Sequence, residues 1–454
     1  MRPLKITING VRGIVGDTLT PQIVTDFAQA VGTYVGGGKV LVSRDTRPSG
    51  EMVASCVFAG LIAAGCQAVD LGICPTPAMQ LAVARSDAEA GVAITAGHNA
   101  QEWNALKVVD RDGLFLNRYQ GGDLLDIYHQ GEYRKAGWQE LRPLLRDDEA
   151  AERHLTAIRR AVPADTVRRH GFKVAVDLCN GACCGPAVRL LEHLGCEVLA
   201  INDDPALPSP REPDPTLVNL GQLRALVTAT DARIGFALDA DGRRLGTVTE
   251  KGDVPGEEFT LCLVAQYLLP RRSGPVVTNL STTQAVAEIA RRHEREIIRT
   301  RIGQSYVAAT ARSQRAAVAG EGSGGVMFPE LNYTHDGLSA MALILCHMAA
   351  SGRPISELVG QVPRFHMVKS KVPCESRRVF TVLQRLRDEL EARDEQEQWR
   401  ISLLDGIHLS ADATWVHVRA SATEPLIRVI AEAQAAAEAQ ALSDEFVQRV
   451  RRLI

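Results

Sequence analysis

The chain has 454 residues, which is too long for a single hydrophobic core, so we expect two to four domains. Hydrophobic residues make up 45% and charged residues 23% of the chain, which is ordinary for a globular protein. Because 51 Lys and Arg nearly balance 54 Asp and Glu, the composition gives no support to nucleic acid or membrane surfaces as partners. Any strong electrostatic field must therefore be local, inside a cleft.

The N-terminus and the cysteines indicate the compartment. The stretch MRPLKITINGVRG lacks the apolar core of a signal peptide, and no apolar run reaches the roughly 18 residues of a membrane span. The longest such run, GLSAMALILCHMAA, is typical of a buried helix. Ten scattered cysteines without a CxxC pair are typical of reduced, buried thiols. We therefore expect a cytoplasmic protein.

Strand-like and helical patterns alternate from the start of the chain. Thr20 and Pro21 suit the N-cap and the first position of a helix, and the apolar residues that follow at helical spacing predict its buried face. These residues are Val24, Phe27, Val31 and Val35. The strand-like KVLVS, the helical EMVASCVFAGLIAAG and two more strand-like runs, QAVDLG and GVAIT, come next.

This cadence of strands and helices occurs near 39–96, 172–240 and 275–328, and it indicates parallel sheets covered by helices. The C-terminal segment differs, because an extended run and a charged helix precede two strands and a closing helix. We predict an α/β protein with three related α/β domains, whose sheets are mixed and mostly parallel, and a smaller C-terminal α+β domain. The expected boundaries are 1–152, 153–254, 255–365 and 366–454.

Two polar loops, at 94–107 and 237–246, are candidates for catalytic or ligand-binding residues. ITAGHNAQEWNALK (94–107) follows a buried strand, where substrates often bind in α/β proteins. Asn104 and Lys107 could hold a phosphate or a sugar hydroxyl, whereas His98 is either functional or a structural histidine. In ALDADGRRLG (237–246), closely spaced carboxylates after an apolar run are typical of a Mg²⁺ site, and equally of a turn. These carboxylates are Asp239 and Asp241.

Two later loops suggest sugar and phosphate binding. AGEGSGGVMFPELN (319–332) is rich in glycine, so its backbone can approach a ligand closely, or it is simply flexible. Glu321 could accept two sugar hydroxyls, and Ser323 lies beside it. VRASATEPLIRVIAEA (418–433) gathers hydroxyls and guanidinium groups around a turn, a combination that suits a phosphate dianion. Its candidate ligands are Arg419, Ser421, Thr423 and Arg428.

These four loops, in this order and spacing, resemble those of the α-D-phosphohexomutase family, which includes phosphoglucosamine mutase, phosphomannomutase and phosphoglucomutase. The resemblance covers nearly the whole chain and implies a central cleft between four domains. It extends to the segments NGVRGIVGDTLTP, SRDTRPSG, PTPA, REPDPTLVNLGQL, RTRIGQSYV and RASATEP. In that family a phosphoserine gives its phosphoryl group to a hexose phosphate through a bisphosphate, while three Asp residues hold Mg²⁺.

The resemblance also implies roles for single residues. Arg12 in NGVRGIVGDTLTP matches the phosphate-facing arginine of the family, and Arg301 in RTRIGQSYV is a candidate substrate contact. Arg244 matches the last residue of the family's DxDxDR motif and is expected to bind substrate. RASATEP is close to the family's RPSGTEP loop, which grips the non-reacting phosphate. EWNALK and GEGSGGVMFPEL look closest to the phosphoglucosamine-mutase-like branch.

Two positions depart from the family pattern, and both belong to the catalytic unit. The family loop TASHNP reads TAGHNA here, so Gly97 stands where the family has its phosphoserine. The metal motif DxDxDR reads DADGRR, so Arg243 stands where the family has its third Asp. A covalent intermediate needs an acceptor atom, which glycine does not offer. The expected catalytic positions remain those of the family: Arg12, Gly97, His98 and Lys107.

Three interpretations follow. In the first, the chain binds a glucosamine, glucose or mannose 1- or 6-phosphate without phosphoserine mutase activity, and Arg243 supplies the charge of the Mg²⁺. In the second, it is a phosphosugar enzyme of altered chemistry, in which His98 accepts the phosphoryl group or a hexose 1,6-bisphosphate donates it directly. In the third, it keeps only the fold and binds a protein partner.

Overall fold

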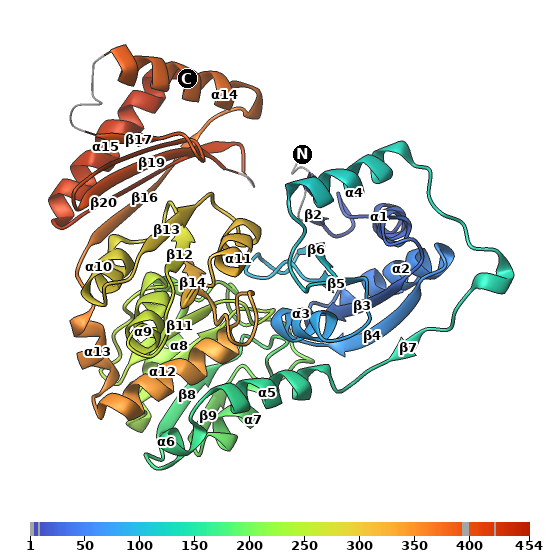
Figure 1. Ribbon diagram of the computed structural model, residues 1–454, viewed down its shortest axis with the longest axis horizontal. Helices are drawn as coiled ribbons and strands as arrows, with labels where there is room; N and C mark the ends of the chain where they lie inside the picture. The colour runs from blue at the N-terminus through green and yellow to red at the C-terminus, as the bar shows by residue number, and fades with distance from the viewer. Residues whose placement is uncertain (1–3, 8–9, 393–398, 422–423) are drawn as a thin grey trace.

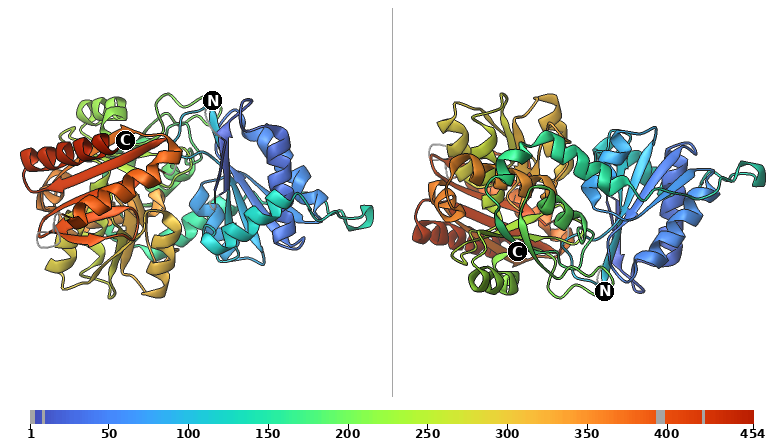
Figure 2. Two further views of the ribbon diagram at one scale, coloured as in Figure 1. Left: turned by 90° about the horizontal axis from the view of Figure 1, so that it is seen from above. Right: turned by 90° about the horizontal axis from the view of Figure 1, so that it is seen from below.

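The computed structural model of the protein describes residues 4–7, 10–392, 399–421 and 424–454 (Figure 1). Three α/β/α domains follow one another along the chain, and a smaller C-terminal domain carries an antiparallel sheet with helices. This confirms the predicted fold class. Figure 2 shows domain I, in blue, on one side of the molecule and the C-terminal domain, in red, on the other.

Domain I is built on a seven-stranded sheet in the order β1-β2-β6-β5-β3-β4-β7. Its β5, β3, β4 and β7 strands are parallel, and β1, β2 and β6 pair antiparallel. Helices α1, α2 and α4 pack on one face and α3 on the other. The elements are β1 Lys5–Thr7, β2 Gly10–Ile14, α1 Pro21–Tyr34, β3 Lys39–Arg44, α2 Gly50–Ala63, β4 Gln67–Ile73, α3 Thr76–Ala84, β5 Ala90–Ile94, β6 Trp103–Asp110, α4 Arg118–Gln130 and β7 Leu145–Arg146.

Helix α1 follows the signals in its sequence. The side chain of Thr20 accepts a hydrogen bond from the backbone N–H of Ile23, and Pro21 occupies the first turn, as predicted. The predicted apolar face is buried at its first three positions and partly buried at the last, where the helix ends: Val24, Phe27, Val31 and Val35.

Domains II and III repeat one architecture. Each has a four-stranded sheet with two parallel pairs and one antiparallel edge strand, in the orders β11-β10-β8-β9 and β13-β12-β14-β15. Domain II comprises α5 Ala150–Ala161, α6 Ala164–Arg168, β8 Lys173–Asp177, α7 Pro186–His193, β9 Glu197–Ile201, α8 Gly221–Thr230, β10 Ile234–Leu238 and β11 Leu245–Thr249. Domain III comprises α9 Glu258–Leu268, β12 Val276–Asn279, α10 Gln284–Arg292, β13 Ile297–Thr300, α11 Gln304–Ser313, β14 Val318–Glu321, β15 Gly325–Met327, α12 Gly337–Ser351 and α13 Ile355–Gln361.

These two domains share one hydrophobic core. Phe236 of β10, Val276 of β12 and Leu343 of α12 belong to the same buried cluster. Helix α12 is buried along almost its whole length and contacts α9 as well as α6 and α7 of domain II. No single helix among the described residues is long and apolar enough to cross a membrane, and α12 and α13 reach that length only together, across a bend of 93°. All ten cysteines are free thiols.

The C-terminal domain has a five-stranded antiparallel sheet in the order β16-β20-β19-β18-β17, with both of its helices packed against it. Two of its short strands, β17 and β18, were not predicted from the sequence. The elements are β16 His366–Pro373, α14 Ser376–Ala392, β17 Arg400–Ser402, β18 Ile407–Ala411, β19 Thr414–Ala420, β20 Leu426–Ala433 and α15 Ala436–Leu453. In Figure 1 this sheet lies above domain III, on the opposite side of the picture from domain I.

Candidate active site

One buried arginine sets the shape of the loop that follows β5. Arg47 donates hydrogen bonds to the backbone carbonyls of Gly97 (2.8 Å), Asn99 (2.7 Å) and Ala100 (2.7 Å). Its charge is balanced by Asp45, whose Oδ2 lies 3.1 Å from the Nε of Arg47, and both side chains are buried. A buried charge needs such a complete set of partners. The SRDTRPSG segment therefore anchors this loop, a role that its resemblance to the family did not reveal.

Gly97 lies where the loops of domains I and II meet. Its φ of +58° is in the left-handed region, which favours glycine. A Cβ atom placed on Gly97 would lie 2.8 Å from Nη2 of Arg243 and 3.3 Å from Nζ of Lys107. The first distance is too short for a carbon contact. The guanidinium group therefore packs against the backbone of Gly97, in space that a side chain would need.

Asp239 and Asp241 follow β10, and both are buried. Nε of Arg243 lies 2.8 Å and Nζ of Lys107 lies 3.3 Å from the same oxygen of Asp241, Oδ2. Burial opposes ionisation of Asp241, but these two cations outweigh it and hold its pKa below the usual range. Burial raises the pKa of Asp239, and the neighbouring Asp241 raises it further. Asp241 is therefore held ionised, whereas Asp239 keeps a proton to a higher pH than an ordinary aspartate.

The surroundings of this pair do not fit a Mg²⁺ ion. One or two carboxylates are often enough for Mg²⁺, and among the described residues one oxygen of Asp239 and one of Asp241 have no hydrogen-bond partner. However, the guanidinium of Arg243 already stands against Asp241, and a divalent cation beside it would be repelled. Within the described ranges, no group of three or more His, Cys, Asp or Glu side chains could hold a metal.

Two basic side chains near Gly97 have unusual proton affinity. Burial and then Arg243 lower the pKa of Lys107 to about 8. Burial and then Arg244 and Arg243 lower the pKa of His98 well below its ordinary value, so its imidazole is neutral at pH 7. Nδ1 of His98 is buried and has no hydrogen-bond partner in the part of the chain that the structure describes. A neutral imidazole with a free nitrogen can accept a hydrogen bond or act as a nucleophile.

The glycine-rich loop presents a carboxylate to the cleft. Oε1 of Glu321 accepts hydrogen bonds from Nδ2 of Asn279 (2.6 Å) and from the backbone N–H of Gly303 (3.1 Å). Its other oxygen lies 3.7 Å from Nε2 of His335, and burial lowers the pKa of this histidine to about 3. Because His335 is neutral, Oε2 of Glu321 keeps capacity to accept hydroxyl groups. Ser323 lines the cleft beside it.

Two arginines of the C-terminal domain face the same cleft. Nε of Arg419 lies 3.7 Å from Oδ1 of Asp405, and Nη2 of Arg428 lies 3.0 Å from Oε2 of Glu424. These carboxylates lie at partly exposed positions, so an incoming phosphate can compete for both guanidinium groups. The strands β19 and β20 thus present guanidinium donors for an anion.

Of the remaining site residues predicted from the sequence, some line the cleft and others do not. Arg12 and Arg244 line the cleft. The hydroxyl of Ser421 accepts a backbone N–H and shapes the turn, whereas Arg301 lies against a tyrosine ring outside the cavity lining. Thr423 lies outside the described residues. Asn104, which could have held a ligand, is buried and donates a hydrogen bond to a serine hydroxyl.

These side chains surround two adjoining cavities of about 680 and 450 Å³, which share several lining residues. The larger cavity receives side chains from all four domains, and the smaller one extends past Lys107 and Arg243. Several lining residues were missed in the sequence: Trp103, Asp214, Glu257, Glu258, Lys369 and Lys371. The alternation of the two lysines along the strand-like MVKSKVP was a signal that both face one side.

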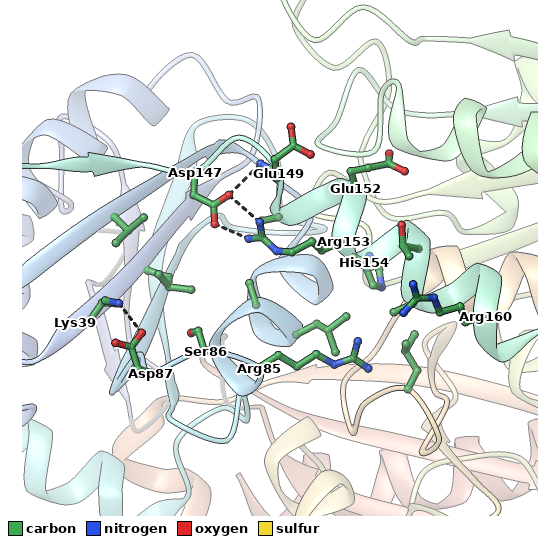
Figure 3. A pocket seen from close by; sticks show the side chains of 18 of the residues that line it. Lys39, Arg85, Ser86, Asp87, Asp147, Glu149, Glu152, Arg153, His154 and Arg160 are labelled. Carbon is green, nitrogen blue, oxygen red and sulfur yellow. Dashed lines mark hydrogen bonds and ion pairs between the residues drawn. The ribbon is translucent and has the colours of Figure 1, made fainter.

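A larger hollow of about 1130 Å³ lies elsewhere, between domain I and α5 (Figure 3). Figure 3 shows Lys39 beside Asp87 and Arg153 beside Asp147, so many of its charges are already paired with each other. Of the four loops with a candidate chemistry, it receives only Glu330 and Leu331, at the end of the glycine-rich loop. We therefore place the site in the cleft between the four domains and not in this larger hollow.

Three α/β/α domains and a smaller C-terminal domain, around a cleft lined by both basic and acidic side chains, define a phosphohexomutase architecture. The description "Phosphoglucomutase/phosphomannomutase, alpha/beta/alpha domain" matches residues 4–135 as domain I, 152–252 as domain II and 256–365 as domain III, and the C-terminal domain of that family matches 367–449. The chain belongs to the phosphoglucomutase/phosphomannomutase family.

Similar proteins agree with this assignment. The chain is 35% identical over 449 residues to a "Probable phosphoglucosamine mutase" of Methanopyrus kandleri, which covers 98% of this chain and 97% of the relative. It is 33% identical to a "Phosphoglucomutase/phosphomannomutase" of Thermococcus kodakarensis, with 95% of each chain covered. A crystal structure of a phosphoglucomutase/phosphomannomutase family protein from Burkholderia thailandensis superposes with a TM-score of 0.83 at 27% identity, over 99% of this chain and 97% of that one.

Proposed function

We propose that the protein binds hexose phosphates of the glucosamine, glucose or mannose class in the four-domain cleft and lacks phosphoserine-based mutase activity. The observation that carries the proposal is Gly97. The residue at the tip of the reaction loop has no atom that could accept a phosphoryl group, and the guanidinium of Arg243 fills the adjoining space.

The binding part of the proposal draws on groups that the cleft retains. Glu321 and Ser323 offer an acceptor and a hydroxyl for the sugar ring, and Arg419 and Arg428 offer guanidinium donors for a phosphate. Arg12 lines the same cavity, with its Nη1 3.0 Å from Oδ1 of Asn99. Because protein groups that bind hydroxyls and protein groups that bind a phosphate line one cavity, a ligand that carries both hydroxyls and a phosphate fits this site better than a ligand with only one of them. A sugar bisphosphate has the same groups and is a second ligand of this class.

The test is a ³¹P NMR series on the full-length protein. Glucosamine 6-phosphate, glucose 6-phosphate and mannose 6-phosphate are added in turn, each with Mg²⁺ and a catalytic amount of the matching 1,6-bisphosphate. We expect line broadening of at least one sugar phosphate and no new signal. A sugar 1-phosphate signal would show that mutase chemistry survives without the serine. Free phosphate would show hydrolysis, and unchanged, unbroadened spectra for all three sugars would remove the binding proposal.

His98 favours a second candidate function, a phosphotransfer that uses histidine as the acceptor. Its imidazole is neutral and Nδ1 lacks a partner among the described residues. In that case the lone pair of an imidazole nitrogen of His98 attacks the phosphorus, the P–O bond to the sugar breaks, and the leaving sugar oxygen takes a proton from the ammonium group of Lys107, which lines the same cavity. An acid-labile phosphoprotein that disappears in His98→Ala would support this function. The absence of phosphoprotein after incubation with the bisphosphate would exclude it.

A further inference from the structure

The two departures from the family pattern meet beside the smaller cavity, which Arg243 lines. Arg243 replaces an expected metal ligand and Gly97 replaces the expected phosphoserine, and the two residues come from different domains. The missing Cβ of Gly97 would lie 2.8 Å from Nη2 of Arg243. A side chain at position 97 would therefore require the guanidinium group of Arg243 to move.

Three groups fix the position of the Arg243 side chain. Its Nε lies 2.8 Å from Oδ2 of Asp241, its Nη1 donates to Oε1 of Gln304 at 3.3 Å, and its guanidinium carbon lies 5.6 Å from the ring centre of Phe115. The side chain is only 15% exposed. An arginine with this many partners loses little freedom on binding a ligand, because its orientation is already set.

Gln304 in turn belongs to a chain of side chains that joins two domains. Its Nε2 donates to Oγ1 of Thr334 at 3.0 Å, and that hydroxyl donates to Oε1 of Gln80 in domain I. Nε2 of Gln80 donates to the backbone carbonyl of Gly113 at 2.8 Å. Arg243 comes from domain II, so this network holds one guanidinium group through contacts with domains I and III.

The remaining donor of the guanidinium is free for a ligand. Within the described part of the chain, Nη2 of Arg243 has no acceptor, and it lies next to Lys107 at the wall of the smaller cavity. A guanidinium donor and an ammonium group side by side suit the oxygens of a phosphate dianion. They supply positive charge in the place where the family pattern would supply it through a metal.

From this geometry we infer that Gly97 and Arg243 form one coupled unit, in which the guanidinium of Arg243 is the resident cation that binds a ligand's phosphate at the end of the cleft formed by domains I and II, without a divalent metal. The inference rests on the proposed function for the identity of the ligand. Its structural part, the exclusion of a side chain at position 97 and of a metal beside Asp241, stands independently of any sugar.

The first arm of the test measures the metal. Mn²⁺ is titrated into the full-length protein without sugar and followed by electron paramagnetic resonance, for the wild type, Arg243→Asp and Arg243→Gln. We expect a bound Mn²⁺ only in Arg243→Asp, which restores a third carboxylate, and none in Arg243→Gln, which removes the charge without adding a ligand. Stoichiometric Mn²⁺ in the wild type, lost in Asp241→Asn, would overturn the inference.

The second arm measures the steric coupling by thermal unfolding. Gly97→Ser should lower the unfolding midpoint by about 2–4 °C in the wild-type background and by clearly less in the Arg243→Asp background, because the guanidinium is then gone. An equal loss in both backgrounds would show that position 97 does not sense Arg243. Thermal unfolding of Arg243→Asp alone checks that this variant folds.

The third arm measures binding of glucose 1,6-bisphosphate, which has one phosphate for each end of the cleft, by calorimetry with EDTA and with Mg²⁺. For the wild type we expect the Kd to change by less than about twofold between the two buffers, and for Arg243→Gln we expect binding at least about tenfold weaker in both. Binding that EDTA abolishes would overturn the inference. Absence of binding in both buffers would remove the proposed function, while the first two arms would still decide the coupled unit.

Discussion

The two ends of the cleft differ in how their charges are used. At the end formed by domains I and II, the charges of Lys107, Asp241 and Arg243 are buried and bonded to one another. At the end formed by domains III and IV, Arg419 and Arg428 have longer or more exposed partners, and the carboxylate of Glu321 keeps an oxygen that can accept hydroxyls. Recognition needs several donors of moderate strength, and it survives small changes. Group transfer needs one particular acceptor atom, so it is lost when that atom is removed.

The largest effect is expected from the residue that builds the first end. Arg47→Ala should lower the free energy of unfolding by about 3–5 kcal/mol, because it leaves the buried Asp45 unpaired and frees three loop carbonyls. Urea denaturation measures this change. Arg44→Ala is the matched control, since that arginine pairs with Glu51 at the surface. Equal losses in both variants would show that Arg47 does not anchor the loop.

The next effect concerns the second end. Arg419→Ala should weaken the binding of sugar phosphate about 10- to 100-fold, because one charge-assisted hydrogen bond to the phosphate is lost. Calorimetry measures the Kd, and thermal unfolding checks the fold. Arg377→Ala is the control in the same domain, since its side chain is 84% exposed and lies outside the cleft. If both variants bind like the wild type, the phosphate does not bind at this loop.

A smaller effect is expected at the first end, where a single added methyl group tests the space at Gly97. Gly97→Ala should destabilise the protein by about 1–2 kcal/mol, because its φ of +58° and the nearby guanidinium both oppose a Cβ. Gly122→Ala in α4 should have the opposite sign and stabilise by about 0.5–1 kcal/mol, since a Cβ there meets no other atom. Denaturation curves of both variants test the contrast. Two changes of the same sign would contradict it.

The smallest effect is a pH dependence at the second end. Burial raises the pKa of Glu258 from an ordinary 4.5 to about 7. The folded state then binds this proton more tightly than the unfolded state, so the stability from this group is present below pH 4.5 and is lost as the pH rises through about 7. Between pH 5 and pH 8 the midpoint should fall by about 1–3 °C more in the wild type than in Glu258→Gln.

Glu257 provides the control for that titration. Although burial opposes it, Lys369 lowers the pKa of this carboxyl group. The stability from Glu257 is therefore present above the ordinary pKa of a glutamate and is lost only as the pH falls below it. Glu257→Gln should lower stability by a constant amount between pH 5 and pH 8 and leave the slope there unchanged. Identical slopes in the wild type and in Glu258→Gln would show that Glu258 is ionised throughout this range.

The sequence by itself determined the fold class and the identity of the loops that matter, because both depend on local patterns. Periodic apolar residues such as Val24 and Phe27 defined α1, and the strings TAGHNA and DADGRR showed where the catalytic unit departs from its family. The positions of Glu321 and Arg428 in the cleft followed from the resemblance. Each of these features lies within a stretch of about 20 residues or fewer, which is the range over which helix and strand periodicity can be recognised.

Only the tertiary structure decided how these loops act on each other. The contact between Gly97 and Arg243, the three carbonyls held by Arg47 and the entry of Lys369 into the cleft all join segments that are distant in the chain. The core that domains II and III share could not be predicted from the sequence either, because each domain has a full pattern of strands and helices of its own. Such contacts depend on how preformed domains dock, and docking is decided by surface shape and charge that no local periodicity encodes.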